Sequence, residues 1–407
     1  MKKNYYAKAL ALTVAASMVS VPAFAAEGTD DPQAQEEMVE QDEQKGEKSA
    51  EEEQEKTEQL VKEEKIEDGI SAASDDDQET AVAEGEVFAK GDCGATEEDE
   101  VSWELVKNDD TLYRKAEENG YSYATTPEDG YEEVDGYTLT ISGSGDMKDY
   151  YAQNVQRAAE FEGDIAPWRR ALLSNTNAER TTQEIVPITK VEIGKDITRI
   201  GSGAFAYTAL TGTVTFSENV HSYGDGVFAK DDLIQAVDWT NFKPENIKEG
   251  WAKNYQEESR AVPYAFFDRC TSLDTCIIDD EKYTGELVLP ENIETICVAA
   301  FRGTAFDTVD FSDGLKHIRA VGSYAISGLA NMKEFTYPGN VDFYSANEEG
   351  RNNVIVGGGI EKLIISKEVT KLPSFFCIST ENLTTIKFEN GAQLKEIGNY
   401  FIFWLFS

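Results

Sequence analysis

Side chains that could carry out catalysis are few and scattered in this chain. Its two histidines, His221 and His317, each fall between apolar positions, where we expect a solvent-exposed imidazole. The five cysteines lack the paired spacing of a zinc site. The run Gly357-Gly358-Gly359 does not connect a strand to a helix, as a phosphate-binding loop would. We therefore predict no catalytic, cofactor-binding or metal site, and a protein that is not an enzyme.

Residues suited to holding a protein partner are better represented. An insertion at 240–261 contains Trp251 and Tyr255 and ends beside Arg260. Residues of these three types supply much of the binding energy in protein interfaces. We predict that they dominate the contact, although Trp251 folding back onto its own coil is an alternative. A secondary surface is expected from threonines at outward positions of predicted strands: Thr213, Thr215 and Thr336.

An apolar repeat must position these residues. Val191 and Ile193 are followed by Ile197 and Ile200, at spacings of two, four and three residues. The same spacing recurs without a gap in Val214/Phe216/Val220/Tyr223, Leu287/Leu289/Ile293/Ile296, Val309/Phe311/Leu315/Ile318, Phe335/Tyr337/Val341/Tyr344 and Leu363/Ile365/Val369/Leu372. A period of about 23 residues predicts a solenoid, because each unit buries its apolar face only by stacking on the next. Alternation at the start of each unit predicts a short strand there.

An aromatic position lies five residues beyond the last apolar residue of several units. It is occupied by Phe205, Phe228, Phe267 and Phe301, which we predict to form one buried ladder. Later units carry Ile326, Cys377 and Ile402 there, so the ladder should shrink. Cysteines at small-residue positions are interpreted as buried thiols, with a Cys270 to Cys276 bridge as the alternative.

The unit resembles the leucine-rich repeat of bacterial BspA-like surface proteins. The match is close over Ile188 to Leu210 and over V-P-Y-A-F-F-D-R-C-T-S-L at Val262 to Leu273. Short motifs that precede the repeats in that family also occur here; they begin at Cys93, Trp103, Leu139 and Ala166. The resemblance covers residues 88–407. It implies a β-rich leucine-rich-repeat solenoid with an N-terminal β-rich cap; a parallel β-helix-like solenoid is the alternative fold.

The N-terminal part differs in composition from the rest. Lys2, Lys3 and Lys8 precede an apolar run closed by Ala23-Phe24-Ala25, which predicts a signal peptide over 1–25. Residues 26–86 contain 24 acidic residues, 5 lysines and no aromatic ring, as is typical of a disordered spacer. We assign 87–180 to the cap and 181–407 to the solenoid, with insertions near 240–261 and 345–353.

These features predict a secreted or cell-surface, non-enzymatic protein that binds another protein. The resemblance implies adhesion to a host or neighbouring-cell surface component. The net charge of −40 disfavours nucleic acid as a partner, and no apolar stretch is long enough to span a membrane. An extracellular carbohydrate-binding or hydrolase accessory module is the alternative function. The chain ends in an apolar run, Phe401 to Phe406, which we interpret as a truncated solenoid.

Overall fold

The computed structural model describes residues 85–117, 120–150, 164–173, 184–245, 260–345 and 353–403. The chain separates into two compact units, Met1–Glu79 and Thr80–Ser407, and every described residue lies in the second. The predicted signal peptide and nearly all of the predicted acidic spacer lie outside the described residues. The described part consists almost entirely of short strands and turns, as the repeat predicts.

An antiparallel sheet opens the described part. β1 (Val87–Asp92) pairs with β2 (Glu100–Glu117), which also pairs with β3 (Gly120–Ala124) and β4 (Glu132–Asp146). Alternate residues of β2 and β4 are buried, as expected when one face of a sheet packs on a core. The acidic stretch 107–135 extends β2 and β4 and adds β3. The two long strands stay in register across it after one irregularity, between Lys107 and Thr111.

β4 joins this cap to the first coil of the solenoid. It pairs in parallel with β5 (Ile188–Ile193) and, further along, with β6 (Asp196–Ile200). The short helix α3 (Pro167–Leu172) contributes Trp168, which is fully buried and donates from Nε1 to the Ala204 carbonyl at 2.9 Å. A Cβ added to Gly201 would lie 1.8 Å from the Lys148 carbonyl oxygen, so only glycine permits this close approach. Cap and solenoid therefore share one sheet and one core, and the boundary at residue 180 stays a prediction.

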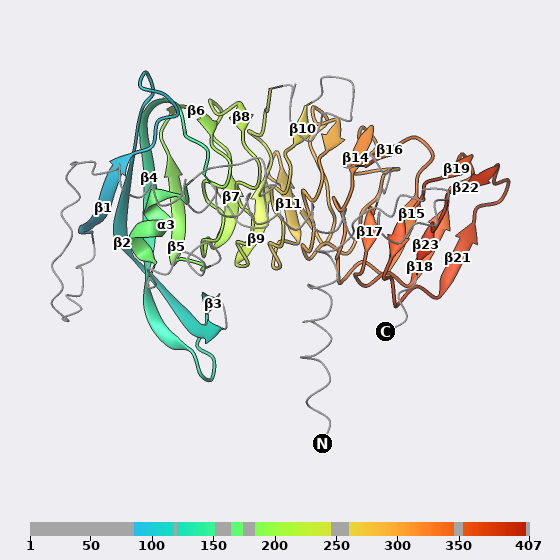
Figure 1. The fold of residues 1–407 in the computed structure, drawn as a ribbon, viewed down its shortest axis with the longest axis horizontal. Helices are drawn as coiled ribbons and strands as arrows, with labels where there is room; N and C mark the ends of the chain where they lie inside the picture. Colours follow the sequence, from blue (N-terminus) through green and yellow to red (C-terminus); the bar gives the residue numbers. More distant parts are fainter. Residues whose placement is uncertain are drawn as a thin grey trace, which may run out of the picture. The chain divides into compact units, whose positions relative to one another are not determined.

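Each coil contributes to parallel rows that run along the solenoid in chain order (Figure 1). We call the row that contains the first strand of each coil the front row. It comprises β5, β7 (Gly212–Thr215), β9 (Ile234–Asp238), β11 (Thr275–Ile278), β15 (Glu334–Tyr337), β18 (Lys362–Ile365) and β21 (Thr385–Phe388). The second row comprises β6, β8 (Ser222–Tyr223), β10 (Ala261–Val262), β13 (Thr295–Ile296), β14 (Ala320–Gly322), β16 (Asp342–Tyr344), β19 (Lys371–Leu372) and β22 (Glu396–Ile397). A third row of turns carries the aromatic positions and ends in β17 (Ile355–Val356), β20 (Cys377–Ile378) and β23 (Ile402–Phe403).

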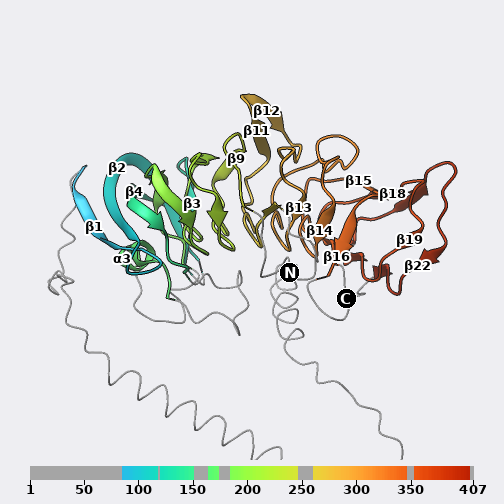
Figure 2. The same cartoon turned by 90° about the horizontal axis from the view of Figure 1, so that it is seen from above.

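The front row is interrupted in the middle of the solenoid. Strands predicted at Leu287 to Leu289 and at Val309 to Phe311 are absent from the described structure, which has only an isolated bridge between Glu286 and Thr308 there. The physical reason lies just before them. β11 turns through Asp279 and Asp280, both with positive φ, into β12 (Glu281–Thr284), which runs antiparallel to it. This hairpin ends the parallel ladder and stands out from its neighbours (Figure 2).

The predicted phenylalanine ladder is confirmed. Ring centroids are 5.7 Å apart for Phe205 and Phe228, 5.3 Å for Phe228 and Phe267, and 6.0 Å for Phe267 and Phe301. All four side chains are buried. In the last coils, where smaller residues take this position, rings from the preceding position stack instead: Phe376 and Phe401 are 5.6 Å apart. Aromatic packing therefore resumes where the sequence predicted that it would shrink.

Asp225 is expected to make the stability of the first coils depend on pH. Burial, together with the nearby carboxylate of Asp149, raises the pKa of its carboxyl to about 7. A group whose pKa is higher in the folded chain binds its proton more tightly there. The contribution of Asp225 to the free energy of unfolding should therefore be fully present below about pH 4 and be lost as the pH rises to about 7.

Asp225→Asn should remove this decline, because the amide does not titrate. Urea unfolding measured from about pH 4 to about pH 8 checks the prediction. Asp129→Asn changes an exposed carboxyl and should keep the wild-type slope. Equal slopes for all three proteins would contradict the assignment to Asp225.

Candidate partner-binding surface

The front row presents polar side chains outward. In β15, Phe335 and Tyr337 are buried whereas Glu334 and Thr336 are exposed. The predicted outward positions Thr213 and Thr215 are likewise exposed on β7, on either side of buried Val214. This pattern leaves the outward side chains free of the stacking that holds the coils together. Val288 would point outward in the strand predicted at Leu287 to Leu289, but it is buried, because the turn at Gly314 packs against its side chain.

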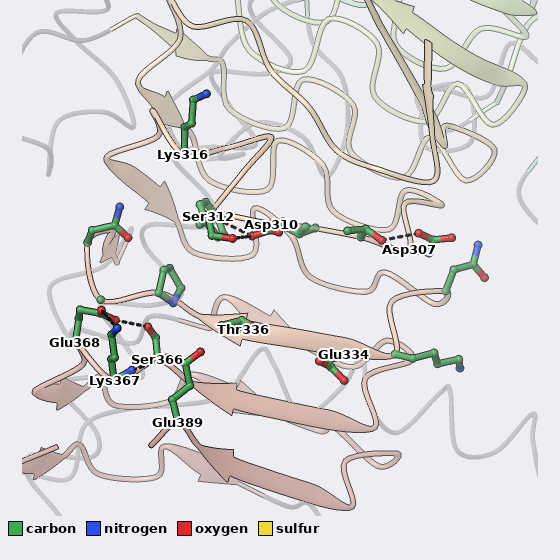
Figure 3. Close-up of a pocket in the computed structure, with 18 residues that line it drawn as sticks. Asp307, Asp310, Ser312, Lys316, Glu334, Thr336, Ser366, Lys367, Glu368 and Glu389 are labelled. Carbon is green, nitrogen blue, oxygen red and sulfur yellow. Dashed lines mark hydrogen bonds and ion pairs between the residues drawn. The ribbon is translucent and has the colours of Figure 1, made fainter. Parts of the chain in front are cut away.

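A groove of about 970 Å³ lies where the front row is interrupted (Figure 3). One wall is the segment from Asp307 to Ser312, and the other is β15. The groove continues over the turns that follow β15, β18 and β21, where Gly339, Glu368 and Glu389 line it. Three apolar residues, Val309, Phe311 and Pro338, are buried beneath this polar lining.

Carboxylates outnumber amines in this groove. The charged lining residues are Asp307, Asp310, Glu334, Glu368 and Glu389, with Lys316, Lys333 and Lys367. Glu334 is paired with Lys362 at 2.6 Å, and Glu368 with Lys367 at 3.6 Å. Asp307 and Asp310 accept hydrogen bonds from the hydroxyls of Thr308 and Ser312, at 2.9 and 2.7 Å. Within the described residues neither of these two aspartates forms an ion pair, so both are available to a cation from outside.

The negative potential extends beyond the groove. Burial raises the pKa of the Glu286 carboxyl, and the carboxylates of Asp313, Asp310 and Asp307 raise it further. Like charges disfavour ionisation of a neighbouring acid. The raised pKa of Glu286 therefore indicates that these acids are concentrated along one wall. A positively charged partner is the one that such a wall attracts.

A second, smaller hollow of about 150 Å³ lies at another break in the front row, between β5 and β7. Thr213 and Thr215 line it, together with residues of the phenylalanine ladder. The structure therefore places these two threonines in one hollow and Thr336 in the other. Sequence reasoning identified outward threonines but missed both hollows, because the apolar spacing continues unchanged across each break.

The three aromatic and basic candidates of the insertion are not brought to either hollow. Trp251 and Tyr255 lie outside the described residues. Arg260 is exposed and directly precedes β10, so it belongs to the second row; its carbonyl accepts from the Glu294 amide at 2.9 Å. The insertion is also less separable than its sequence suggests. Phe242 is buried, with its ring centroid 4.7 Å from that of Phe216, so deleting Asn241 to Ser259 would remove a core side chain.

Histidines and cysteines form no reactive arrangement in the described structure. His221 is exposed, with its Nδ1 3.7 Å from a Glu245 carboxylate oxygen. His317 is half-buried rather than solvent-exposed, and burial lowers its pKa. All five cysteines are free and buried, as predicted, and burial raises the pKa of Cys93, Cys276, Cys297 and Cys377 to about 12. Such thiols are poor nucleophiles at neutral pH, because the thiolate is the reactive form.

Two further searches of the described residues complete the inventory. No group of three or more metal-ligating side chains is placed to hold an ion within this part of the chain. Among the same residues, no helix has the length and hydrophobicity that crossing a bilayer requires. The groove is the larger of the two hollows described among these residues.

A comparison with protein families identifies the repeat. Residues 179–284 and 280–404 match the model of the BspA type Leucine rich repeat region, in 6 copies. A leucine-rich repeat protein from Eubacterium ventriosum is 17% identical, with 71% of this chain and 84% of that one covered and a TM-score of 0.32. A leucine-rich repeat protein from Bacteroides ovatus is 13% identical, with 72% of this chain and 78% of that one covered and a TM-score of 0.33. A leucine rich cell surface protein from Faecalibacterium prausnitzii is 14% identical, with 72% of this chain and 81% of that one covered and a TM-score of 0.27. No curated protein sequence matches this chain significantly.

Proposed function

This chain belongs to the BspA-type leucine-rich repeat family, and from that premise we propose that it is a secreted or cell-surface protein that binds another protein without catalysis. The polar groove on the front row is the observation that carries the proposal. Its outward side chains play no part in the stacked core. The signal-like sequence at 1–25 supports export.

The insertion at 240–261 is proposed as a second contact. Trp251, Tyr255 and Arg260 are the residue types that anchor protein interfaces. Because Phe242 belongs to the core, a test deletion must spare it and remove only 246–259. Loss of affinity in that variant, with an unchanged unfolding transition, is the result expected of a second contact.

The groove can be tested by adding bulk at its centre. Thr336→Arg places a large side chain on exposed β15, whereas Thr370→Arg makes the same change at an exposed position outside the groove lining. Residues 26–407 carrying either substitution, and the wild type, would be titrated against a panel of purified extracellular-matrix and cell-surface proteins. We expect at least one protein to bind the wild type, and Thr336→Arg to weaken it by about tenfold or more. Thr370→Arg should keep the wild-type affinity.

A glycan panel run in parallel separates the two functions. Carboxylates and hydroxyls in the groove could also bind sugars, but Phe311 is its one aromatic lining residue and is buried. Binding to glycans with no binding to proteins would overturn the proposal in favour of a carbohydrate-binding module. Protein binding that Thr336→Arg leaves unchanged would exclude the groove as the contact surface.

A further inference from the structure

The strand β15 has one edge with no hydrogen-bonding neighbour in the described structure. It pairs with β18 on one side, and β18 pairs with β21, so β15 ends this sheet. On its other side lies the segment Asp307 to Ser312, across the groove (Figure 3). No backbone hydrogen bond joins this segment to β15 among the described residues. An open strand edge inside a solenoid is unusual, since stacking normally pairs every coil with the next.

The peptide groups of β15 that face the groove can be identified from those that bond to β18. The carbonyls of Lys333 and Tyr337 accept hydrogen bonds from the amides of Lys362 and Ser366, at 3.0 and 3.2 Å. Backbone groups of successive residues in a strand point alternately to its two sides. The N–H and C=O of Glu334 and Thr336 therefore point away from β18 and toward the groove.

The opposite wall presents backbone groups as well. Thr308 uses its peptide groups toward the preceding coil: its carbonyl accepts from the Leu287 amide and its amide donates to the Gly285 carbonyl, each at 3.0 Å. Among the described residues, the peptide groups of Val309 form no backbone hydrogen bond. The groove is thus bordered on both sides by backbone donors and acceptors that extended polypeptide satisfies best.

We propose that the groove takes an extended peptide segment of the partner, which adds as a strand to the open edge of β15. This inference rests on the proposed function and specifies its binding mode. Buried Val309, Phe311 and Pro338 would lie beneath alternate guest side chains and favour small apolar residues there. The intervening guest side chains would meet Asp307 and Asp310, which have no cation partner among the described residues, and so favour lysine or arginine.

Charge also excludes one guest from within the chain. Residues 26–86 contain 24 acidic residues against 5 lysines, and five of the eight charged groove residues are already carboxylates. Repulsion would oppose insertion of that segment. The guest is therefore a segment of another protein, with lysine or arginine alternating with small apolar residues.

A proline scan of the two sheet edges tests the mode directly. Thr336→Pro removes an N–H that faces the groove and leaves the bonds to β18 intact. Thr385 and Glu389 direct their amides toward β18, so by alternation the N–H of Ile386 points away from it. Ile386→Pro therefore removes an N–H from the far edge of the same sheet. Proline is tolerated at strand edges where its nitrogen faces outward, so both variants are matched in their effect on the fold.

The probe is a fluorescently labelled peptide of about six residues that alternates lysine and valine, titrated by anisotropy. We expect Thr336→Pro to weaken binding by about tenfold and Ile386→Pro to leave it within about twofold. Peptides N-methylated at alternate residues, made in both phases, should lose affinity in at least one phase. A peptide with glutamate in place of lysine should not bind. Equal binding of the unmodified peptide and both N-methylated peptides would overturn strand addition.

Hydrogen exchange on the wild type covers the case in which Thr336→Pro fails to fold. On addition of the peptide, the amides of Glu334 and Thr336 should exchange more slowly, whereas that of Ile386 should not change. Unaltered exchange at Glu334 and Thr336 with a saturating peptide would overturn the inference. A protein partner whose affinity falls with Thr336→Arg but not with Thr336→Pro would also overturn it, while the proposed function would stand.

Discussion

Phe228→Ala is expected to lower the free energy of unfolding by about 3 to 5 kcal/mol, the usual cost of removing a buried aromatic ring. The ring of Phe228 is stacked on Phe267 of the next coil with an interplanar angle of 9°. Its centroid also lies 5.4 Å from that of Phe266, the neighbour of Phe267 in the chain. Because neighbouring coils are rigidly stacked on both sides, the cavity can collapse little. Chemical denaturation followed by tryptophan fluorescence measures the change.

Phe388→Ala serves as the matched control for this prediction. The same atoms are removed from a side chain that is 46% exposed, so a loss of no more than about 1 kcal/mol is expected. Equal effects at the two positions would mean that the ladder does not hold the coils together.

Arg302→Leu should be nearly as damaging, by about 3 kcal/mol, because it leaves a buried carboxylate without its partner. Asp268 is 1% exposed and accepts from Arg302 Nε at 2.7 Å and Nη2 at 2.6 Å. The next guanidinium, that of Arg269, is 4.0 Å away and offers only partial compensation. Thermal or urea unfolding at neutral pH measures the loss.

A double variant tests the stated cause. Arg302→Leu combined with Asp268→Asn removes both charges, so part of the stability should return. Arg319→Leu changes a more exposed arginine, paired with Glu294 at 3.5 Å, and should cost less than about 1 kcal/mol. If the double variant were no more stable than Arg302→Leu, the penalty would come from lost packing and not from the uncompensated charge.

The solenoid itself could be predicted because apolar spacing is a local property that recurs in every coil. The ladder from Phe205 to Phe301 followed from the same count of residues. Its continuation through Phe376 and Phe401 did not, because a shift of one position in sequence moves a ring between neighbouring places in the same core. Burial of Phe242 was missed for a related reason, since it lies in an insertion where no repeat fixes the register.

The candidate groove could not be predicted from the repeat. The front row is first interrupted at the hairpin turn of Asp279 and Asp280, which lies 27 residues before the wall at Asp307. Val309 keeps its apolar spacing whether or not its backbone is paired, so the pattern carries no trace of the break. An interruption of pairing is a tertiary property, and only the positions of neighbouring coils reveal it.

The break in the front row also has a mechanical consequence, because the third row continues across it. The amides of Tyr324 and Gly328 donate to the carbonyls of Asn353 and Val356, so the coils on either side of the groove stay bonded at the back. A stack that is fastened along one side and open along the other bends most easily about the fastened side. This position is thus a built-in hinge, where load applied to the solenoid would first be relieved by widening a gap and not by breaking a ladder.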